Sequence, residues 1–168
     1  NDLTVVILDR QRHRALINDV RRTGARIRLI SDGDVAGALM AALPESGIDV
    51  LLGTGGTPEG VLAACALRCT GGNMQCRLVA RNESELRRGQ QAGMDFNKVL
   101  SLEDLVSSDD VFFAATGITN GDLLQGVDYT PGGARTDSIV MRGLTGTIRR
   151  ISAEHRLDKL GKISSIEY

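Results

Sequence analysis

The sequence predicts an α/β fold with a layered, largely parallel sheet flanked by helices and an antiparallel hairpin near the C-terminus. A short apolar run, a polar loop and an apolar helical segment follow one another three times within residues 3–70. Such alternation is typical of a parallel sheet covered by helices. Two further strand-like runs, at residues 136–142 and 145–153, are separated by glycines and predict the hairpin.

The first 70 residues supply three strand–helix repeats. The first strand, LTVVIL, is continuously apolar, as expected of a parallel strand that is buried on both faces. The first helix carries Leu16, Ile17 and Val20 on one face, and Gly24 ends it. The predicted elements are strands at residues 3–8, 25–30 and 48–52, helices at residues 12–23 and 35–43, and a third helix that ends near residue 70.

The remaining residues predict shorter elements and more turns. Ser101 suits the N-cap of a helical turn, and DVFFAA at residues 110–115 predicts another buried strand. We expect the polar tail from His155 to pack at an edge or to fray. The other predicted elements are a strand at residues 74–79, a charged helix at residues 82–92, and a turn rich in glycine and aspartate at residues 116–122.

Polar groups follow all three parallel strands at the point where each strand ends. Arg10 and Arg12 follow the first strand, and Asp32-Gly33-Asp34 follows the second. The third strand leads into GTGGTPEG at residues 53–60, which contains Glu59. Ligands of open α/β sheets bind beyond the carboxyl ends of the strands. These loops therefore predict a binding site for a charged, hydroxylated ligand.

Each loop also has a purely structural interpretation. Arginine forks bind phosphate, but Arg10 and Arg12 could equally be solvated side chains at a helix start. Asp34 could bind a sugar hydroxyl or a metal, or serve as a helix N-cap. Glu59 lies where free backbone donors attract phosphate and where a carboxylate could hold a hard cation, but an acid also stabilises a helix start. For residues 116–122 we favour a structural turn.

Composition and motifs exclude several function classes. The net charge of −1 and the sequence pI of about 6.2 give no electrostatic case for nucleic acid or a membrane surface. No apolar run is long enough to span a bilayer, and the first residues do not form a signal peptide. Pro58 stands where a dinucleotide fingerprint needs its last glycine, and the Walker lysine and a nucleophile elbow are absent.

The cysteines and the first residue bear on where the protein works and how complete it is. Three cysteines without a disulfide-like pattern favour a reducing compartment, so we expect a cytoplasmic protein. Cys65 and Cys69 lie four residues apart, but a zinc site needs more ligands, and we interpret them as buried or idle thiols. The chain begins at Asn1, which leads us to expect part of a longer protein or a processed product.

Six ordered segments together resemble one known family. They are Asp9-Arg10-Gln11-Arg12-His13, Ser31-Asp32-Gly33-Asp34-Val35-Ala36-Gly37, Gly55-Gly56-Thr57-Pro58-Glu59-Gly60, Leu67-Arg68-Cys69 with Gly71-Gly72, Ala114-Ala115-Thr116-Gly117-Ile118-Thr119 and Gly132-Gly133-Ala134-Arg135-Thr136. These segments resemble the class II fructose-1,6-bisphosphatases. They are most similar to the cyanobacterial-type enzymes that also act on sedoheptulose 1,7-bisphosphate. The resemblance covers nearly the whole chain, but only the C-terminal half of the family.

The resemblance implies a lithium-sensitive, metal-dependent sugar phosphatase that hydrolyses the 1-phosphate of a sugar bisphosphate with Mg²⁺ or Mn²⁺. It implies that Glu59 is a metal ligand and that Gly56 contacts the substrate through its backbone. Gln11 stands where many members have proline. The other implied substrate-binding residues are Arg10, Gln11, Arg12, Asp32, Gly33 and Asp34. The catalytic residues themselves stay unassigned.

The family's other metal ligands come from an N-terminal half that this sequence lacks. We therefore expect residues 1–168 to form a single α/β domain that is inactive alone and is the C-terminal half of a larger phosphatase. Its expected partners are a sugar bisphosphate, the N-terminal half of the same enzyme and further copies in a homo-oligomer. The alternatives are a non-catalytic, regulatory sugar-phosphate-binding domain and a purely structural α/β subunit.

Overall fold

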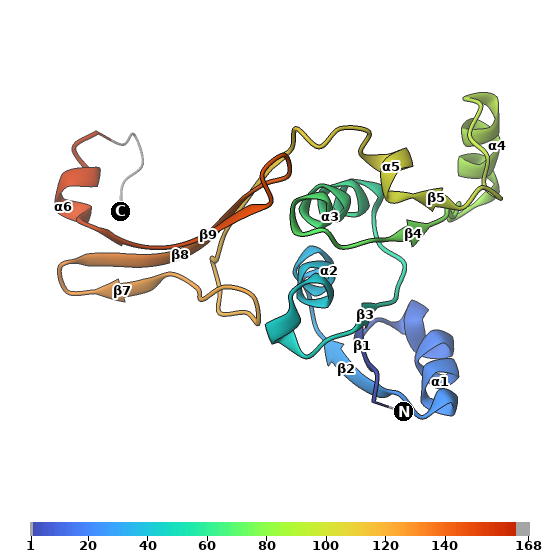
Figure 1. Cartoon of the computed structure of the whole chain (residues 1–168), viewed down its shortest axis with the longest axis horizontal. Helices are drawn as coiled ribbons and strands as arrows, with labels where there is room; N and C mark the ends of the chain where they lie inside the picture. The colour runs from blue at the N-terminus through green and yellow to red at the C-terminus, as the bar shows by residue number, and fades with distance from the viewer. Residues whose placement is uncertain (1, 164–168) are drawn as a thin grey trace.

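A computed structural model describes residues 2–163 of the chain (Figure 1). It confirms the predicted α/β architecture, with a parallel sheet flanked by helices and an antiparallel C-terminal hairpin. The strands are β1 (Thr4–Leu8), β2 (Arg26–Ile30), β3 (Val50–Leu51), β4 (Gln75–Cys76), β5 (Leu100–Ser101), β6 (Phe112–Thr116), β7 (Asp128–Thr130), β8 (Gly133–Arg142) and β9 (Thr147–His155). The helices are α1 (Arg14–Thr23), α2 (Asp34–Ala42), α3 (Thr57–Thr70), α4 (Glu83–Gln91), α5 (Leu102–Leu105) and α6 (Leu157–Leu160), with 3-10 turns η1 (Gln11–His13) and η2 (Pro44–Ser46).

The first sheet, sheet A, is parallel and has the strand order β2-β1-β3. Successive side chains of its central strand point to opposite faces. Val5 and Ile7 share a buried cluster with α1, whereas Val6 and Leu8 share one with Met40 of α2. The sheet therefore has α1 on one face and α2 on the other, as the continuously apolar first strand predicts.

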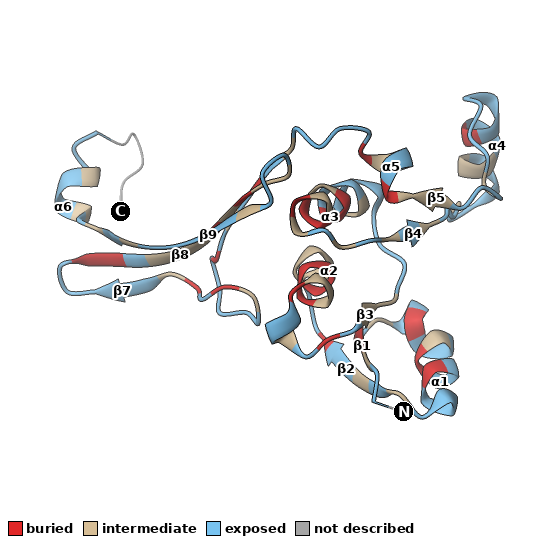
Figure 2. Cartoon of the chain, viewed as in Figure 1, coloured by how far each residue is buried: buried red, intermediate tan, exposed pale blue. Residues whose placement is uncertain are grey.

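Helix α3 joins sheet A and its helices to the antiparallel strands (Figure 1). One buried cluster combines Leu39 of α2, Ala66 and Cys69 of α3, and Ile139 and Met141 of β8. Figure 2 shows buried residues concentrated in α2, α3 and parts of β8, whereas α4 and β7 are mostly exposed. The core thus runs from sheet A through two helices to the last strands.

The last strands form an antiparallel sheet, sheet C (β6, β7, β8 and β9). β8 pairs with β9 on one edge and with β6 and β7 on the other, so the predicted hairpin is confirmed and sits within a larger sheet. The prediction that residues 110–115 are a buried strand is wrong in its burial. β6 begins at Phe112, which is 66% exposed, and Phe113 is its single buried residue. One face of β6 packs on α3, and the other face is open.

Capping residues in the sequence predict the helix ends well, whereas two of the predicted strands are longer than the observed ones. Gly24 and Gly71 close α1 and α3 in the left-handed conformation, with φ of 78° and 74°, and Ser101 caps α5. The strands predicted at residues 48–52 and 74–79 contain only two paired residues each. The predicted tail is β-strand to His155 and then α6, and its last five residues lie outside the described part. No helix within residues 2–163 has the length and apolar character of a membrane span.

Candidate functional site

The strand order of sheet A brings the first and third loops together. The chain leaves β1 for β2 on one side and then crosses to β3 on the other side of β1. The connections that follow β1 and β3 consequently run in opposite directions. Such a switch point leaves a crevice at the carboxyl ends of the two neighbouring strands, which is where open α/β sheets bind ligands.

Two hydrogen bonds connect the loop after β1 with the loop after β3, and a third ties His13 to the end of β1. The Thr54 N–H donates to Nε2 of His13 over 2.9 Å, and Nε of Arg12 donates to the Thr54 carbonyl over 2.8 Å. Nδ1 of His13 lies 2.9 Å from the Leu8 carbonyl at the end of β1. The third loop is therefore attached to the end of the central strand.

The loop after β2 reaches the same place through Asp34. A Cβ added at Gly55 would lie 2.8 Å from Oδ2 of Asp34, so the carboxylate lies directly against the third loop. Gly33, with a φ of 84°, is the N-cap of α2, and Asp34 is its first residue. The alternative that Asp34 is the N-cap is therefore wrong. Its Oδ1 accepts a hydrogen bond from the Val35 N–H over 3.0 Å.

Glu59 lies in the exposed first turn of α3, and its carboxylate folds back over Gly56. A Cβ added at Gly56 would overlap Oε2 of Glu59. Gly56 is the N-cap of this helix, so the carboxylate stands at the helix start beside backbone donors that have no helical partner. Within residues 2–163 no ion pair holds the Glu59 carboxylate.

The remaining predicted site residues lie at the same edge of sheet A. Arg10 is half-buried, and its guanidinium makes a weak 3.5 Å contact with the Asp9 carbonyl. Gln11 is exposed at the start of η1. Asp32 is also exposed, and its Oδ1 accepts the Gly33 N–H over 2.8 Å. Among the described residues, the side chains of Arg10 and Gln11 therefore keep most of their polar groups free to meet a ligand.

The donor set of this edge fits a phosphorylated sugar better than a metal cluster. Arg10 and Arg12 can meet phosphate, and Asp32 and Asp34 can accept hydrogen bonds from hydroxyls. Within residues 2–163 no group of three or more histidine, cysteine or acidic side chains is arranged to hold a metal. Glu59 can supply one carboxylate ligand.

The two cysteines of α3 do not extend this donor set. Both are free thiols, and Cys69 is buried. Burial, and then the neighbouring Cys65, raises the pKa of the Cys69 thiol. A protonated, buried thiol is a poor metal ligand and nucleophile. The interpretation of Cys69 as a buried thiol agrees with this geometry.

Reasoning from the sequence missed the part that His13 plays. Its side chain is 2% exposed, and it is the single buried polar or charged residue of the described core. A usable signal was present, because His13 at the end of η1 and Ile17 and Val20 of α1 recur at helical spacing on one buried face.

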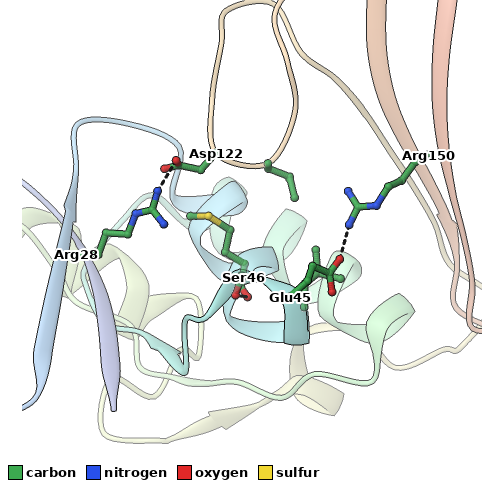
Figure 3. A pocket seen from close by; sticks show the side chains of 8 residues that line it. Arg28, Glu45, Ser46, Asp122 and Arg150 are labelled. Carbon is green, nitrogen blue, oxygen red and sulfur yellow. Dashed lines mark hydrogen bonds and ion pairs between the residues drawn. The ribbon is translucent and has the colours of Figure 1, made fainter. Parts of the chain in front are cut away.

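A separate cavity of about 460 Å³ lies away from the strand ends, between the C-terminal end of α2 and sheet C (Figure 3). Arg28 pairs with Asp122 on one side of it, and Arg150 pairs with Glu45 on the other. The four charged side chains that line the cavity are therefore paired with one another. None of the predicted site residues lines it. Asp122 has the structural role favoured for the turn at residues 116–122.

One protein family and several individual proteins of similar sequence match this chain. The family described as "Bacterial fructose-1,6-bisphosphatase, glpX-encoded" matches residues 1–155. A class 2 fructose-1,6-bisphosphatase from Haemophilus influenzae is 46% identical over 179 residues, covering 99% of this chain and 54% of that protein. Fructose-1,6-bisphosphatase 1 class 2 from Escherichia coli K12 is 42% identical, covering 95% of this chain and 51% of that protein. The chain spans about half the length of the curated relatives that it matches.

Proposed function

Because the chain belongs to the class 2, glpX-encoded bacterial fructose-1,6-bisphosphatases, we propose that it forms the substrate-binding side of such an enzyme. The complete enzyme removes the 1-phosphate of fructose 1,6-bisphosphate. This chain contributes the three loops at the carboxyl edge of sheet A and one metal ligand, Glu59. A second protein segment, corresponding to the N-terminal half of the relatives, contributes the other metal ligands.

The single observation that carries this proposal is the meeting of three loops at one edge. Thr54 is bonded to Arg12 and His13, and Asp34 lies against Gly55. Basic, acidic and glycine backbone groups thus come together where α/β sheets bind ligands. A purely structural edge does not require exposed charges from three separate loops.

Each loop has a distinct task in the proposed reaction. The guanidinium groups of Arg10 and Arg12 bind phosphate oxygens, and the Gln11 loop backbone holds their spacing. Asp32 and Asp34, set by the turn at Gly33, orient the sugar through its hydroxyls, which reduces the entropic part of the barrier. Gly56 offers backbone to the substrate. Glu59 would hold part of a Mg²⁺ or Mn²⁺ site, and the bound cation would neutralise phosphoryl charge and activate water.

The first test removes the proposed metal ligand from an enzyme assembled from two parts, which we call the complemented enzyme. The chain is combined with the N-terminal half of the Haemophilus influenzae relative, and phosphate release from fructose 1,6-bisphosphate is followed across Mn²⁺ concentrations. Losing an outer-shell partner of a metal costs about 10–100-fold, so we expect Glu59→Gln to lose at least about 100-fold in kcat/KM. Part of that activity should return at high Mn²⁺ concentration, because the substitution lowers the affinity of the site for Mn²⁺.

Glu83→Gln is the matched control for this experiment. Glu83 is also an exposed acid in a helix first turn, but it lies on α4 and pairs with Arg87. It should leave the Mn²⁺ dependence unchanged. Turnover of Glu59→Gln that equals the parent's at every Mn²⁺ concentration, with the same melting temperature, would show that Glu59 is not a metal ligand.

A second candidate function is a regulatory domain that binds sugar phosphate without turnover. It is favoured by the absence of a three-ligand metal cluster within residues 2–163. Calorimetry with fructose 1,6-bisphosphate, run beside the phosphate-release assay, separates the two functions. Binding by a folded, complemented protein that never releases phosphate would favour the regulatory domain. No binding at all would favour a structural subunit.

Three further features complete the proposed enzyme. We propose that it also accepts sedoheptulose 1,7-bisphosphate, which has the same terminal phosphate, and competition between the two sugars tests this. The three free cysteines fit a cytoplasmic enzyme. We also propose a homo-oligomer, which light scattering of the complemented protein measures.

A further inference from the structure

We propose that His13 is a positioning residue of this site, because it fixes the Thr54 backbone and so sets the course of the loop that leads to Gly56 and Glu59. The hydrogen bonds of His13 do not depend on what the protein catalyses. Its catalytic consequence rests on the proposed phosphatase function. The experiments below therefore measure the geometry and the activity separately.

The bonding partners of His13 define its tautomer. Its Nδ1 lies 2.9 Å from the Leu8 carbonyl, and a carbonyl can only accept, so Nδ1 carries the proton. Nε2 of the neutral ring is then an acceptor, and it receives the Thr54 N–H over 2.9 Å. The Thr54 carbonyl, 3.2 Å from the same Nε2, is a contact without a hydrogen bond in this tautomer.

The ring is packed as well as bonded. A Cβ added at Gly53 would lie 3.3 Å from Cε1 of His13 and 3.4 Å from its Nε2. The imidazole therefore lies against the Gly53 backbone, and a larger residue there would press on it. Arg12 adds a bond from its Nε to the Thr54 carbonyl over 2.8 Å. Consecutive residues of η1 thus hold both backbone polar groups of Thr54.

These contacts matter because the loop has little else to hold it. Three of the residues at positions 53–56 are glycines, whose backbones lose the most conformational freedom when they are fixed. Within residues 2–163 the hydrogen bonds of Thr54 are the one that its N–H donates to His13 and the one that its carbonyl accepts from Arg12. Gly55, against Asp34, and Gly56, beneath Glu59, are the next residues. A catalytic group must stay within about 0.5 Å of its productive place, so looseness at Thr54 reaches the proposed ligand.

Two polar substitutions of His13 separate the two bonds. In His13→Gln, the Oε1 oxygen reaches roughly where Nε2 stands and can accept the Thr54 N–H. In His13→Asn, the shorter amide can donate to the Leu8 carbonyl but leaves Thr54 unbonded. Both replace a buried ring with a neutral amide, so a purely structural role predicts similar effects for both. A positioning role predicts rescue by glutamine alone.

The first readout is amide hydrogen exchange of Thr54 in the full 168-residue chain. One hydrogen bond is worth about tenfold in such an equilibrium, so we expect about tenfold faster exchange in His13→Asn and near-parental exchange in His13→Gln. Gly53→Ala displaces the ring without removing it and should give an intermediate rate. This variant also keeps the test available if a His13 variant does not fold. His155→Gln, on sheet C beside Thr136, is the control and should change nothing at Thr54.

The second readout is phosphate release by the same variants in the complemented enzyme. We expect His13→Asn to lose about 10–100-fold in kcat/KM, the range for groups that support a metal ligand, with a raised Mn²⁺ requirement. His13→Gln should stay within a few-fold of the parent. Equal exchange at Thr54 in the two His13 variants, or equal activities, would overturn the positioning role. If exchange follows the prediction while the parent releases no phosphate, the proposed function is wrong, but His13 still fixes the Thr54 backbone.

Discussion

At the residue scale, the glycines before α3 leave room for carboxylates of the protein itself. Neither Gly55 nor Gly56 has a positive φ, so a left-handed backbone is not the reason for glycine here. Instead Asp34 occupies the space beside Gly55, and Glu59 occupies the space over Gly56. The family resemblance implies that the Gly56 backbone contacts the substrate. The structure adds that two acids of the protein share that space.

This crowding predicts a specific effect of Gly56→Ala. Its methyl group must displace the Glu59 carboxylate, so we expect about a tenfold or larger rise in the Mn²⁺ concentration needed for phosphate release by the complemented enzyme. Gly60→Ala in the same helix meets nothing within 4 Å. It should raise stability by about 0.5–1 kcal/mol, as alanine does in a helix, and leave the Mn²⁺ requirement alone. A Gly56→Ala enzyme with parental Mn²⁺ dependence would place Glu59 away from the metal.

At the element scale, the sequence predicts features that neighbouring residues decide. Gly24 ends α1, and Ser101 forms a capping box with Asp104, each through contacts within a few residues. The short β3 depends instead on β1, a partner far along the chain, because a strand exists only where another strand pairs with it. The unpredicted β7 pairs with β8, the next strand in the chain. The meeting of Asp34, Gly55 and Arg12 follows from strand order. The sequence predicts parallel strands, but it does not say which strand is central.

The capping box on α5 predicts a pH-dependent contribution to stability. A hydrogen bond from Lys98, followed by one from the Ser101 backbone, holds the pKa of Asp104 below its ordinary value of 3.8. A carboxylate with a lowered folded pKa stabilises the fold above its unfolded pKa, and this contribution is lost as the pH falls through the folded pKa. Asp104→Asn should therefore lower the melting temperature at neutral pH, and its difference from the parent should shrink below pH 3.8.

Thermal melts from neutral to acidic pH measure this effect. Asp110→Asn is the control, because no ion pair to Asp110 forms within residues 2–163. It should follow the parent at every pH. A melting-temperature difference for Asp104→Asn that is the same at pH 7 and in strong acid would mean that shape, and not charge, explains its effect.

At the scale of the whole molecule, sheet A with its helices and sheet C are joined in two ways. The apolar connection is the cluster of α2, α3 and β8 that contains Leu39 and Ile139. The polar connection consists of the ion pairs Arg28–Asp122 and Arg150–Glu45 on either side of the cavity in Figure 3. Because the paired side chains are about half exposed, the apolar cluster should dominate the attachment.

The double substitution Arg28→Gln with Arg150→Gln tests this division. Exposed ion pairs contribute up to about 1 kcal/mol each, so urea unfolding at about 10 mM salt should show a loss of at most about 2 kcal/mol. The loss should fade at about 1 M salt, where charges are screened over about 3 Å. Arg22→Gln removes a pair within α1 and serves as the control. A loss that persists at high salt would assign the arginines a packing role.

The strand order β2-β1-β3 also has a consequence for the rate at which the molecule forms. Thr4 of β1 pairs with Arg26 of β2, and Val5 pairs with Val50 of β3, whereas Arg142 of β8 pairs with nearby Thr147 of β9. Contacts between distant residues close large loops and slow folding, while local hairpins form within microseconds. The β8–β9 hairpin can therefore form early. The three loops of the proposed site reach their places only after β3 pairs with β1, so the folding chain completes the proposed site late.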